Sequence, residues 1–135
     1  MKLNHVHIKV SNIEISREFY LSLGFKIRER VGPFLFLHLG DEHHSLALQE
    51  IHDAEKQGEN SIGLYHFSLE VENEQEFGAM INNLKQNNIP YSPIDHQISK
   101  VVYFSDPDNN GIEIMLDTRK SKQQLWKGKN LPLDI

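Results

Sequence analysis

Cysteine is absent from this chain of 135 residues. Its absence excludes disulfide bonds, thiolate catalysis and zinc sites built from cysteine. Long apolar runs are absent as well, because no stretch of the sequence approaches the roughly 20 residues that span a bilayer. Positive charge is in the minority, with 14 lysine and arginine residues against 19 aspartate and glutamate residues and a formal net charge of -5. We therefore expect no nucleic-acid partner and no membrane-surface partner.

The remaining composition is that of a globular domain, since 39% of the residues are hydrophobic and the net charge is small. Eight histidines are present, which is unusual for a chain of this length. The chain opens with the alternating residues MKLNHVHIKV, a pattern typical of a strand and not of a signal peptide. We therefore expect a cytoplasmic protein with a single domain over residues 1–135.

An internal repeat relates two stretches of the chain. Residues 3–10 and residues 64–71 each begin with leucine, carry histidine at the third position and end with valine. The two histidines, His5 and His66, are 61 positions apart. Apolar residues alternate with other residues in both stretches, which predicts a strand in each copy.

A helix is predicted after each of these strands. Ser11 with Glu14, and Asn73 with Glu76, have the spacing of a capping box at the start of a helix. Pro90 should end the second helix. The apolar side chains expected to face the core recur at helical spacing: Ile15, Phe19 and Leu23 in the first helix, and Phe77, Met80, Ile81 and Leu84 in the second.

Three further strands are predicted after each helix, separated by turns rich in glycine, proline, aspartate and asparagine. Their expected ranges are 25–31, 34–39 and 45–51 in the first half and 89–94, 101–105 and 111–116 in the second. Each half is then a βαβββ module, over about residues 1–52 and about 62–117, and a tail follows over residues 118–135. The predicted fold class is α+β, and two modules of one design usually create a shared concave site.

Two histidines and one glutamate are candidate metal ligands. His5 and His66 are equivalent in the repeat. Glu113 lies between two isoleucines of the last predicted strand, so alternation turns it away from their face, whereas Ala47 occupies the equivalent position of the first half. Two imidazoles and a carboxylate can form a facial triad that leaves positions on a metal ion open for substrate and oxygen. The alternative is a pair of histidines that match only through duplication, with a solvated glutamate.

The sequence resembles the vicinal oxygen chelate superfamily, which includes glyoxalase I, fosfomycin-resistance enzymes, bleomycin-binding proteins and extradiol dioxygenases. The resemblance covers about residues 3–126 and rests on four stretches, which are residues 4–10, 18–25, 63–67 and 106–113. It implies two βαβββ modules whose cupped mixed sheets surround a divalent metal ion. The metal ligands of the family would fall on His5, His66 and Glu113.

Within the superfamily the chain is most similar to a catechol 2,3-dioxygenase domain. That branch has a histidine cluster matched here by His43 and His44, and a histidine and a tyrosine matched by His96 and Tyr103. The resemblance implies that His44 is the acid and base and that His96 and Tyr103 bind the substrate oxygens. A catechol must lose a proton when it binds a metal ion, and histidine titrates near neutral pH. The implied function is ring cleavage of a catechol-like diol with Fe(II) or Mn(II), while Zn(II) or Ni(II) is also compatible.

Other interpretations stay open for several histidines. His43 and His44 belong to a polar turn where solvated histidines are ordinary, and His96 could be a simple loop residue. His38 and His52 have no partner pattern, so we expect them to be structural or on the surface.

Two other classes of function are compatible with the sequence. A metal-dependent thiol transferase or isomerase of the glyoxalase or fosfomycin-resistance type would share the two histidines and the glutamate. Ala47 disfavours glyoxalase I itself, because that enzyme has a second metal carboxylate at this strand position. A non-catalytic protein that binds a small molecule such as a drug would need no metal ligands, so the retained triad argues against this class.

The resemblance also implies a homodimer that acts on a small-molecule substrate. The tail is unusually apolar and should cover a subunit interface or the mouth of the site, although a loose end is the common alternative. The apolar tail residues are Leu125, Trp126, Leu131, Leu133 and Ile135.

Overall fold

The computed structural model describes all 135 residues, and they form two compact units. Unit 1 comprises Met1–Ile62 together with Asp106–Asn109. Unit 2 comprises Gly63–Ser105 together with Asn110–Ile135. Neither of the two helices has the length and apolar character that a membrane crossing requires.

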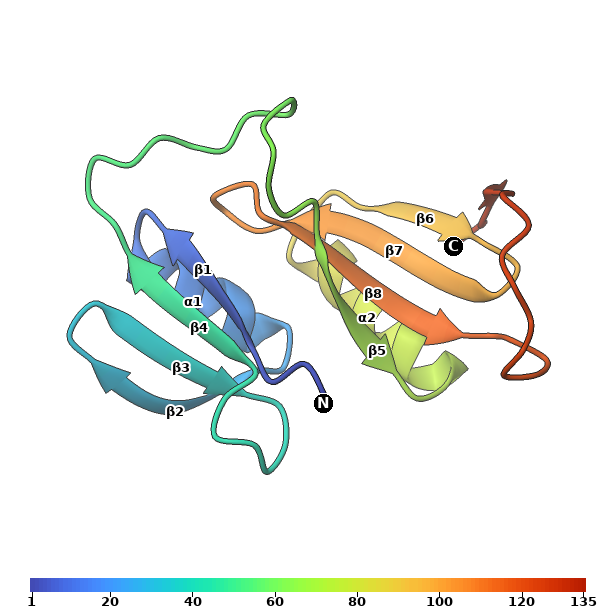
Figure 1. Cartoon of the computed structure of the whole chain (residues 1–135), viewed down its shortest axis with the longest axis horizontal. Helices are drawn as coiled ribbons and strands as arrows, with labels where there is room; N and C mark the ends of the chain where they lie inside the picture. Colours follow the sequence, from blue (N-terminus) through green and yellow to red (C-terminus); the bar gives the residue numbers. More distant parts are fainter. The chain divides into compact units, whose positions relative to one another are not determined.

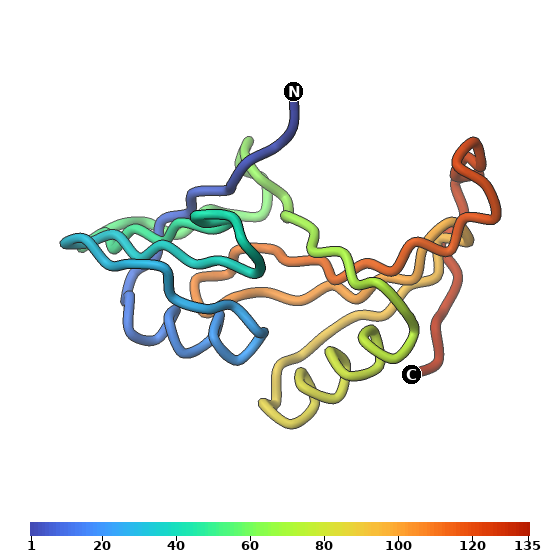
Figure 2. The backbone as a smooth tube through the Cα atoms, turned by 90° about the horizontal axis from the view of Figure 1, so that it is seen from below, coloured from blue at the N-terminus to red at the C-terminus, as the bar shows by residue number.

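Unit 1 is a four-stranded mixed sheet with one helix on a face of that sheet (Figures 1 and 2). The strand order is β1-β4-β3-β2, with β1 parallel to β4 and the other pairs antiparallel. Helix α1 contacts β4. The elements are β1 (Val6–Val10), α1 (Ile13–Ser22), β2 (Lys26–Val31), β3 (Phe34–His38) and β4 (Leu46–Glu50).

Unit 2 repeats this plan and adds one edge strand. Its order is β5-β8-β7-β6-β9, with β5 parallel to β8 and helix α2 in contact with β8. The elements are β5 (Phe67–Val71), α2 (Glu74–Gln86), β6 (Ser92–Asp95), β7 (Ser99–Ser105), β8 (Gly111–Asp117) and β9 (Leu131–Pro132). The repeat analysis did not predict β9, which the tail contributes.

The predicted α+β fold of two βαβββ modules is confirmed, because both sheets have the same strand order and the same parallel pair. The strand registers also agree, since His7 pairs with Ala47 in unit 1 and Ser68 pairs with Glu113 in unit 2. The first strand of each module begins later than predicted, at Val6 and Phe67. His5 and His66 therefore each lie one residue before a strand.

The first helix starts differently from the prediction. Asn12 caps α1, since its Oδ1 accepts hydrogen bonds from the backbone nitrogens of Glu14 and Ile15, each at 3.1 Å. The predicted cap Ser11 binds Asp108 instead, through its backbone nitrogen at 2.9 Å. Ile15, which was expected to face the core, is 55% exposed. The buried residues of α1 are Ile13, Ser16 and Tyr20.

The second helix starts as predicted. Asn73 accepts a hydrogen bond from the backbone nitrogen of Glu76 at 2.8 Å, and the Glu76 carboxylate accepts one from the backbone nitrogen of Glu72. The helix ends at Gln86, ahead of Pro90. Its buried residues are Phe77, Ile81 and Leu84, so the predicted apolar stripe is confirmed apart from the half-buried Met80.

Candidate functional site

In unit 1, His5 and His44 are neighbours. Their ring centroids are 4.4 Å apart, and Phe36 of β3 contacts the His44 ring at 4.9 Å. His44 is half-buried, and its Nδ1 lies 2.8 Å from Nδ1 of His43. The other ring nitrogen of His43 lies 2.9 Å from the Glu29 carboxylate on β2. A carboxylate and three imidazoles thus form one connected group at the ends of β1 and β4, and Glu29 was not predicted as part of it.

The loop between β3 and β4 holds His43 and His44 through main-chain hydrogen bonds. The Glu42 carboxylate accepts hydrogen bonds from the backbone nitrogens of Leu39 at 3.1 Å and Gly40 at 2.6 Å. These bonds, the one from Leu39 first, lower the pKa of Glu42 from 4.5 to about 2. The Arg28 guanidinium donates to the carbonyl oxygens of His43 at 3.0 Å and Glu42 at 2.9 Å. The loop is therefore ordered by charged side chains.

Burial lowers the pKa of His44, and the imidazoles of His5 and His43 lower it further when they carry charge. These effects favour the neutral imidazole of His44, which has a ring nitrogen that can accept a proton. No such electrostatic signal is visible in the sequence, where His44 lies in an ordinary polar turn.

In unit 2, His66 and Glu113 are brought together. Nε2 of His66 lies 3.8 Å from Oε2 of Glu113, which exceeds a hydrogen-bond distance. The hydroxyl of Ser68 donates to Oε1 of Glu113 at 2.6 Å and fixes the carboxylate, whose residue is only 9% exposed. Ser68 was not predicted to contribute to the site, although it pairs with Glu113 in the strand register.

The His66 and Glu113 pair fits a divalent metal ion. Two neighbouring donor atoms that each lie about 2.1 Å from one ion are separated by about 3.0 to 3.4 Å, and the observed 3.8 Å would close to this range with a small movement of either side chain. Nε2 is the ring nitrogen of His66 next to the Glu113 carboxylate and so the one placed to bind an ion, while Nδ1 is buried without a hydrogen-bond partner. An imidazole and a carboxylate are also the donor types that such ions bind.

Gly111 sets the backbone beside His66. A Cβ placed on this residue would overlap the carbonyl oxygen of Tyr65 and come within 3.1 Å of the His66 Cβ. Any side chain at position 111 would therefore displace the segment that carries His66.

Tyr103 of β7 links the His66 and Glu113 pair to His96. Its ring centroid lies 5.3 Å from that of His66, and its hydroxyl lies 3.0 Å from Nε2 of His96. Burial raises the pKa of the Tyr103 hydroxyl, and the negative charge of the nearby Glu113 carboxylate raises it further. The hydroxyl therefore stays protonated at neutral pH and can donate.

The predicted site residues fall into two groups. His5 and His44 belong to unit 1, whereas His66, Tyr103 and Glu113 belong to unit 2, together with His96. Within each unit, no three histidine, aspartate or glutamate side chains are grouped closely enough to hold one ion. The structure thus brings together one pair of predicted ligands, His66 and Glu113, in unit 2.

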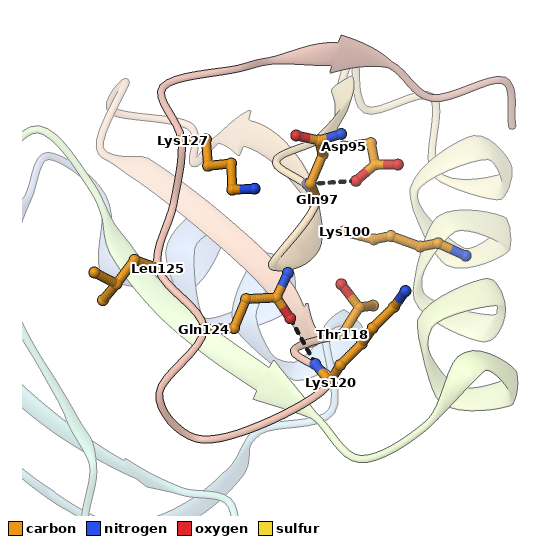
Figure 3. Close-up of a pocket in the computed structure, with 8 residues that line it drawn as sticks. All are labelled: Asp95, Gln97, Lys100, Thr118, Lys120, Gln124, Leu125 and Lys127. Carbon is orange, nitrogen blue, oxygen red and sulfur yellow. Dashed lines mark hydrogen bonds between the residues drawn. The ribbon is translucent and has the colours of Figure 1, made fainter.

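A separate cavity of about 430 Å³ lies in unit 2 beneath the tail (Figure 3). None of the six predicted site residues lines it, although Asp95 and Gln97 flank His96 in the sequence. The lining residues are Asp95, Gln97, Lys100, Thr118, Lys120, Gln124, Leu125 and Lys127. Lys100 is engaged there by Glu74 of α2, at 2.7 Å.

Known proteins resemble this chain over most of its length. Catechol-2,3-dioxygenase of Bacillus subtilis (strain 168) is 30% identical over 124 residues, which are 90% of this chain and 44% of that protein. The chain thus spans less than half the length of this relative. Metallothiol transferase FosB of Staphylococcus epidermidis (strain ATCC 12228 / FDA PCI 1200) is 26% identical over 134 residues, which are 95% of this chain and 90% of the transferase.

A solved structure supports the same fold. The glyoxylase/bleomycin resistance protein/dioxygenase domain from Frankia sp. EAN1pec superposes with a TM-score of 0.78 at 23% identity, over 90% of this chain and 95% of that one. A sequence model of the Glyoxalase/Bleomycin resistance protein/Dioxygenase superfamily also matches residues 2–114. With the duplicated βαβββ module, these matches show that the chain belongs to the glyoxalase/bleomycin resistance protein/dioxygenase superfamily, which is the vicinal oxygen chelate superfamily.

Proposed function

We propose that this protein is a divalent-metal-dependent enzyme that cleaves the ring of a catechol-like diol with dioxygen. The observation that carries the proposal is the arrangement around Tyr103. Its hydroxyl lies 3.0 Å from the His96 imidazole, beside a ring contact with His66 at 5.3 Å. Two adjacent oxygens of a diol need hydrogen-bonding groups next to the metal ligands, and this group of side chains supplies them.

His5, His66 and Glu113 are the proposed metal ligands, the first from unit 1 and the others from unit 2. Two imidazoles and one carboxylate suit Fe(II) or Mn(II), and Zn(II) or Ni(II) also binds such donors. The ion would act as a Lewis acid toward the diol and provide a binding position for dioxygen.

The remaining predicted residues have roles that follow from their neighbours. His44 lies against His5 and has a lowered pKa, which suits a group that takes a proton from the diol and later returns it. His96 and Tyr103 would bind the substrate oxygens, with the protonated Tyr103 hydroxyl as donor.

A thiol transferase is the second candidate. The metallothiol transferase relative is matched over 90% of its length, whereas the catechol dioxygenase relative is matched over 44%. A transferase could use the same His66 and Glu113 pair but would have no need of His44, Tyr103 or His96.

The metal proposal is tested by elemental analysis of protein purified without an affinity tag. Wild-type protein should bind one divalent ion for each set of His5, His66 and Glu113, and Glu113→Ala should lose this binding. Glu70→Ala, which removes an exposed glutamate from β5, is the matched control and should bind as the wild type does. Full metal binding by Glu113→Ala would contradict the assignment.

The reaction is tested by anaerobic loading with Fe(II), addition of a panel of catechols, and measurement of oxygen uptake. One molecule of dioxygen should be consumed for each diol cleaved. His44→Ala should lower turnover by about 10² to 10⁴ while metal binding is retained. His52→Ala, at an exposed position, should leave turnover unchanged. Absence of uptake together with opening of an epoxide by a thiol would favour the second candidate.

A further inference from the structure

The tail of unit 2 returns to the sheet and reaches the proposed substrate-binding residue His96. Strand β9 pairs antiparallel with the edge strand β6, with Asp95 opposite Leu131 and Ile94 opposite Pro132. Continuing this register by one residue places Asn130 opposite His96. Directly opposed residues of an antiparallel pair have their side chains within reach of each other.

The side chains make the contact that the register predicts. Oδ1 of Asn130 lies 2.6 Å from Nδ1 of His96, while Nε2 of the same ring lies 3.0 Å from the Tyr103 hydroxyl. Trp126 contacts the ring edge-on, with centroids 6.1 Å apart. Both ring nitrogens of His96 are thus engaged, one by the tail and one by the proposed site.

A turn between Trp126 and Asn130 fixes the tail in this position. The indole nitrogen of Trp126 donates to the carbonyl oxygen of Lys129 at 3.0 Å, which closes the turn. Gly128 has a φ of 79°, a left-handed conformation that glycine adopts without strain. The turn therefore brings the Trp126 indole and the Asn130 amide to the same imidazole, that of His96.

The rest of the tail has little packing beneath it. The segment that carries Gln124 and Lys127 passes over the 430 Å³ cavity, and its apolar residue Leu125 is 78% exposed (Figure 3). Mostly polar side chains line this space. The tail is therefore held near its end by β9 and by the contacts with His96. No buried apolar side chain of residues 120–130 holds it in place.

The contact has a chemical consequence for His96. An amide oxygen only accepts hydrogen bonds, so Nδ1 of His96 must carry a proton to satisfy Asn130. In a neutral imidazole the other nitrogen is then unprotonated. Nε2 is left as an acceptor that faces the Tyr103 hydroxyl.

We propose that Asn130 is a positioning residue that fixes the tautomer of His96. It keeps the proton on Nδ1 and leaves Nε2 as an acceptor, either for the Tyr103 hydroxyl or for a substrate hydroxyl that takes its place. The value of this tautomer for catalysis rests on the proposed function, whereas the tautomer itself is a property of unit 2 alone.

The test uses the full chain labelled with nitrogen isotope in histidine, and long-range nitrogen–proton correlation spectra of the imidazole rings. The His96 signals are assigned by their loss in His96→Gln. At a pH where the ring is neutral, the wild type should show His96 with its proton on Nδ1. Asn130→Ala should move the proton toward Nε2. Asn130→Asp should restore the original form, because a carboxylate oxygen accepts the same hydrogen bond.

Gln123→Ala is the matched control, since it removes an exposed amide from the same tail. Its His96 spectrum should equal that of the wild type, and all variants should keep the wild-type backbone spectrum. An unchanged His96 tautomer in Asn130→Ala, or a proton on Nε2 in the wild type, would overturn the proposal. Neither result depends on turnover, so absence of ring cleavage would count against the proposed function and not against the role of Asn130.

If diols are cleaved, the kinetic effect should follow the spectra. Asn130→Ala should lower kcat/KM by about tenfold, the size of one lost hydrogen bond, and Asn130→Asp should recover most of it. A loss in Asn130→Ala that Asn130→Asp does not recover would indicate that the residue has only a structural role.

Discussion

The hydroxyl of Tyr20 shows how a polar group is satisfied inside unit 1. Tyr20 is fully buried and donates a 2.7 Å hydrogen bond to Oδ2 of Asp106. The other oxygen of Asp106 accepts from the backbone nitrogen of Asp108, which in turn binds Ser11. The turn that resembles the family motif thus serves as a structural tie to the start of α1, within unit 1.

Removal of this hydroxyl should destabilise the protein. Tyr20→Phe keeps the ring but deprives a buried carboxylate of a donor, which should cost about 1–3 kcal/mol in the free energy of unfolding. Urea denaturation monitored by circular dichroism measures the change. Tyr91→Phe, at a half-buried position without such a partner, should shift the midpoint little. Equal effects of the two substitutions would show that the Asp106 hydrogen bond adds no stability.

At the scale of elements, the sequence predicts what depends on periodicity and repetition. Alternation and the repeat predict the eight strands of the two modules, and they single out the His66 and Glu113 pair that the structure brings together in unit 2. Strand β9 has only two residues, one of them proline, so no alternation is available to reveal it. The proposed role of Asn130 depends on the register of β9, so it could not be predicted from the sequence either.

Choices between adjacent polar residues were also beyond the sequence. Ser11 and Asn12 are both suitable helix caps. Asp108 binds Ser11 through a tertiary contact, so Asn12 caps the helix. Glu29 joins His43 only through the folding of β2, because 14 residues separate the two in the chain.

The loop that carries His44 should depend on Arg28. Arg28→Ala removes hydrogen bonds to two loop carbonyls, and the local opening free energy of residues 39–45 should fall by about 1–2 kcal/mol. Amide hydrogen exchange of the loop measures this change, with Arg17→Ala on α1 as the control. Arg28→Lys should recover little, since lysine lacks the planar fork. Unchanged exchange in Arg28→Ala would show that the guanidinium does not order the loop.

The same loop should be sensitive to acid. In the folded protein the pKa of Glu42 is about 2, below the ordinary 4.5. The ionised carboxylate therefore contributes its full effect on loop order at pH values above 4.5. It is lost as the pH falls from about 4.5 toward about 2. Histidine ring signals of His43 and His44 followed over this range should broaden or shift, and Glu42→Gln should show the loosened loop already at neutral pH. A loop that is identical in wild type and Glu42→Gln would contradict this.

At the scale of the whole molecule, the tail leaves apolar side chains in contact with solvent. Leu125 is 78% exposed and Trp126 is 51% exposed, although Trp126 also contacts His96. Exposed apolar groups that lie close together often mark an interaction surface. The family resemblance implies a homodimer, and we expect a second copy of this chain to cover this surface.

We predict a dimer that Leu125→Asp weakens. Sedimentation at micromolar concentration should give twice the chain mass for the wild type and the single chain mass for Leu125→Asp, because a charge would be buried against an apolar partner. Ile15→Asp replaces a residue of 55% exposure on α1 and should remain dimeric. A wild type that sediments as a single chain would contradict the prediction.

Gly111 has a consequence for how this protein can change over generations. Because any β-carbon there would push against the backbone next to His66, a library of random variants should lose almost every substitution at position 111. A selection for activity would then rank Gly111 with the proposed metal ligands, although it has no side chain to touch a substrate. The position of the His66 imidazole depends on the absence of a β-carbon at residue 111. Glycine at this position should therefore be under as strong a selection as a residue that takes part in the chemistry.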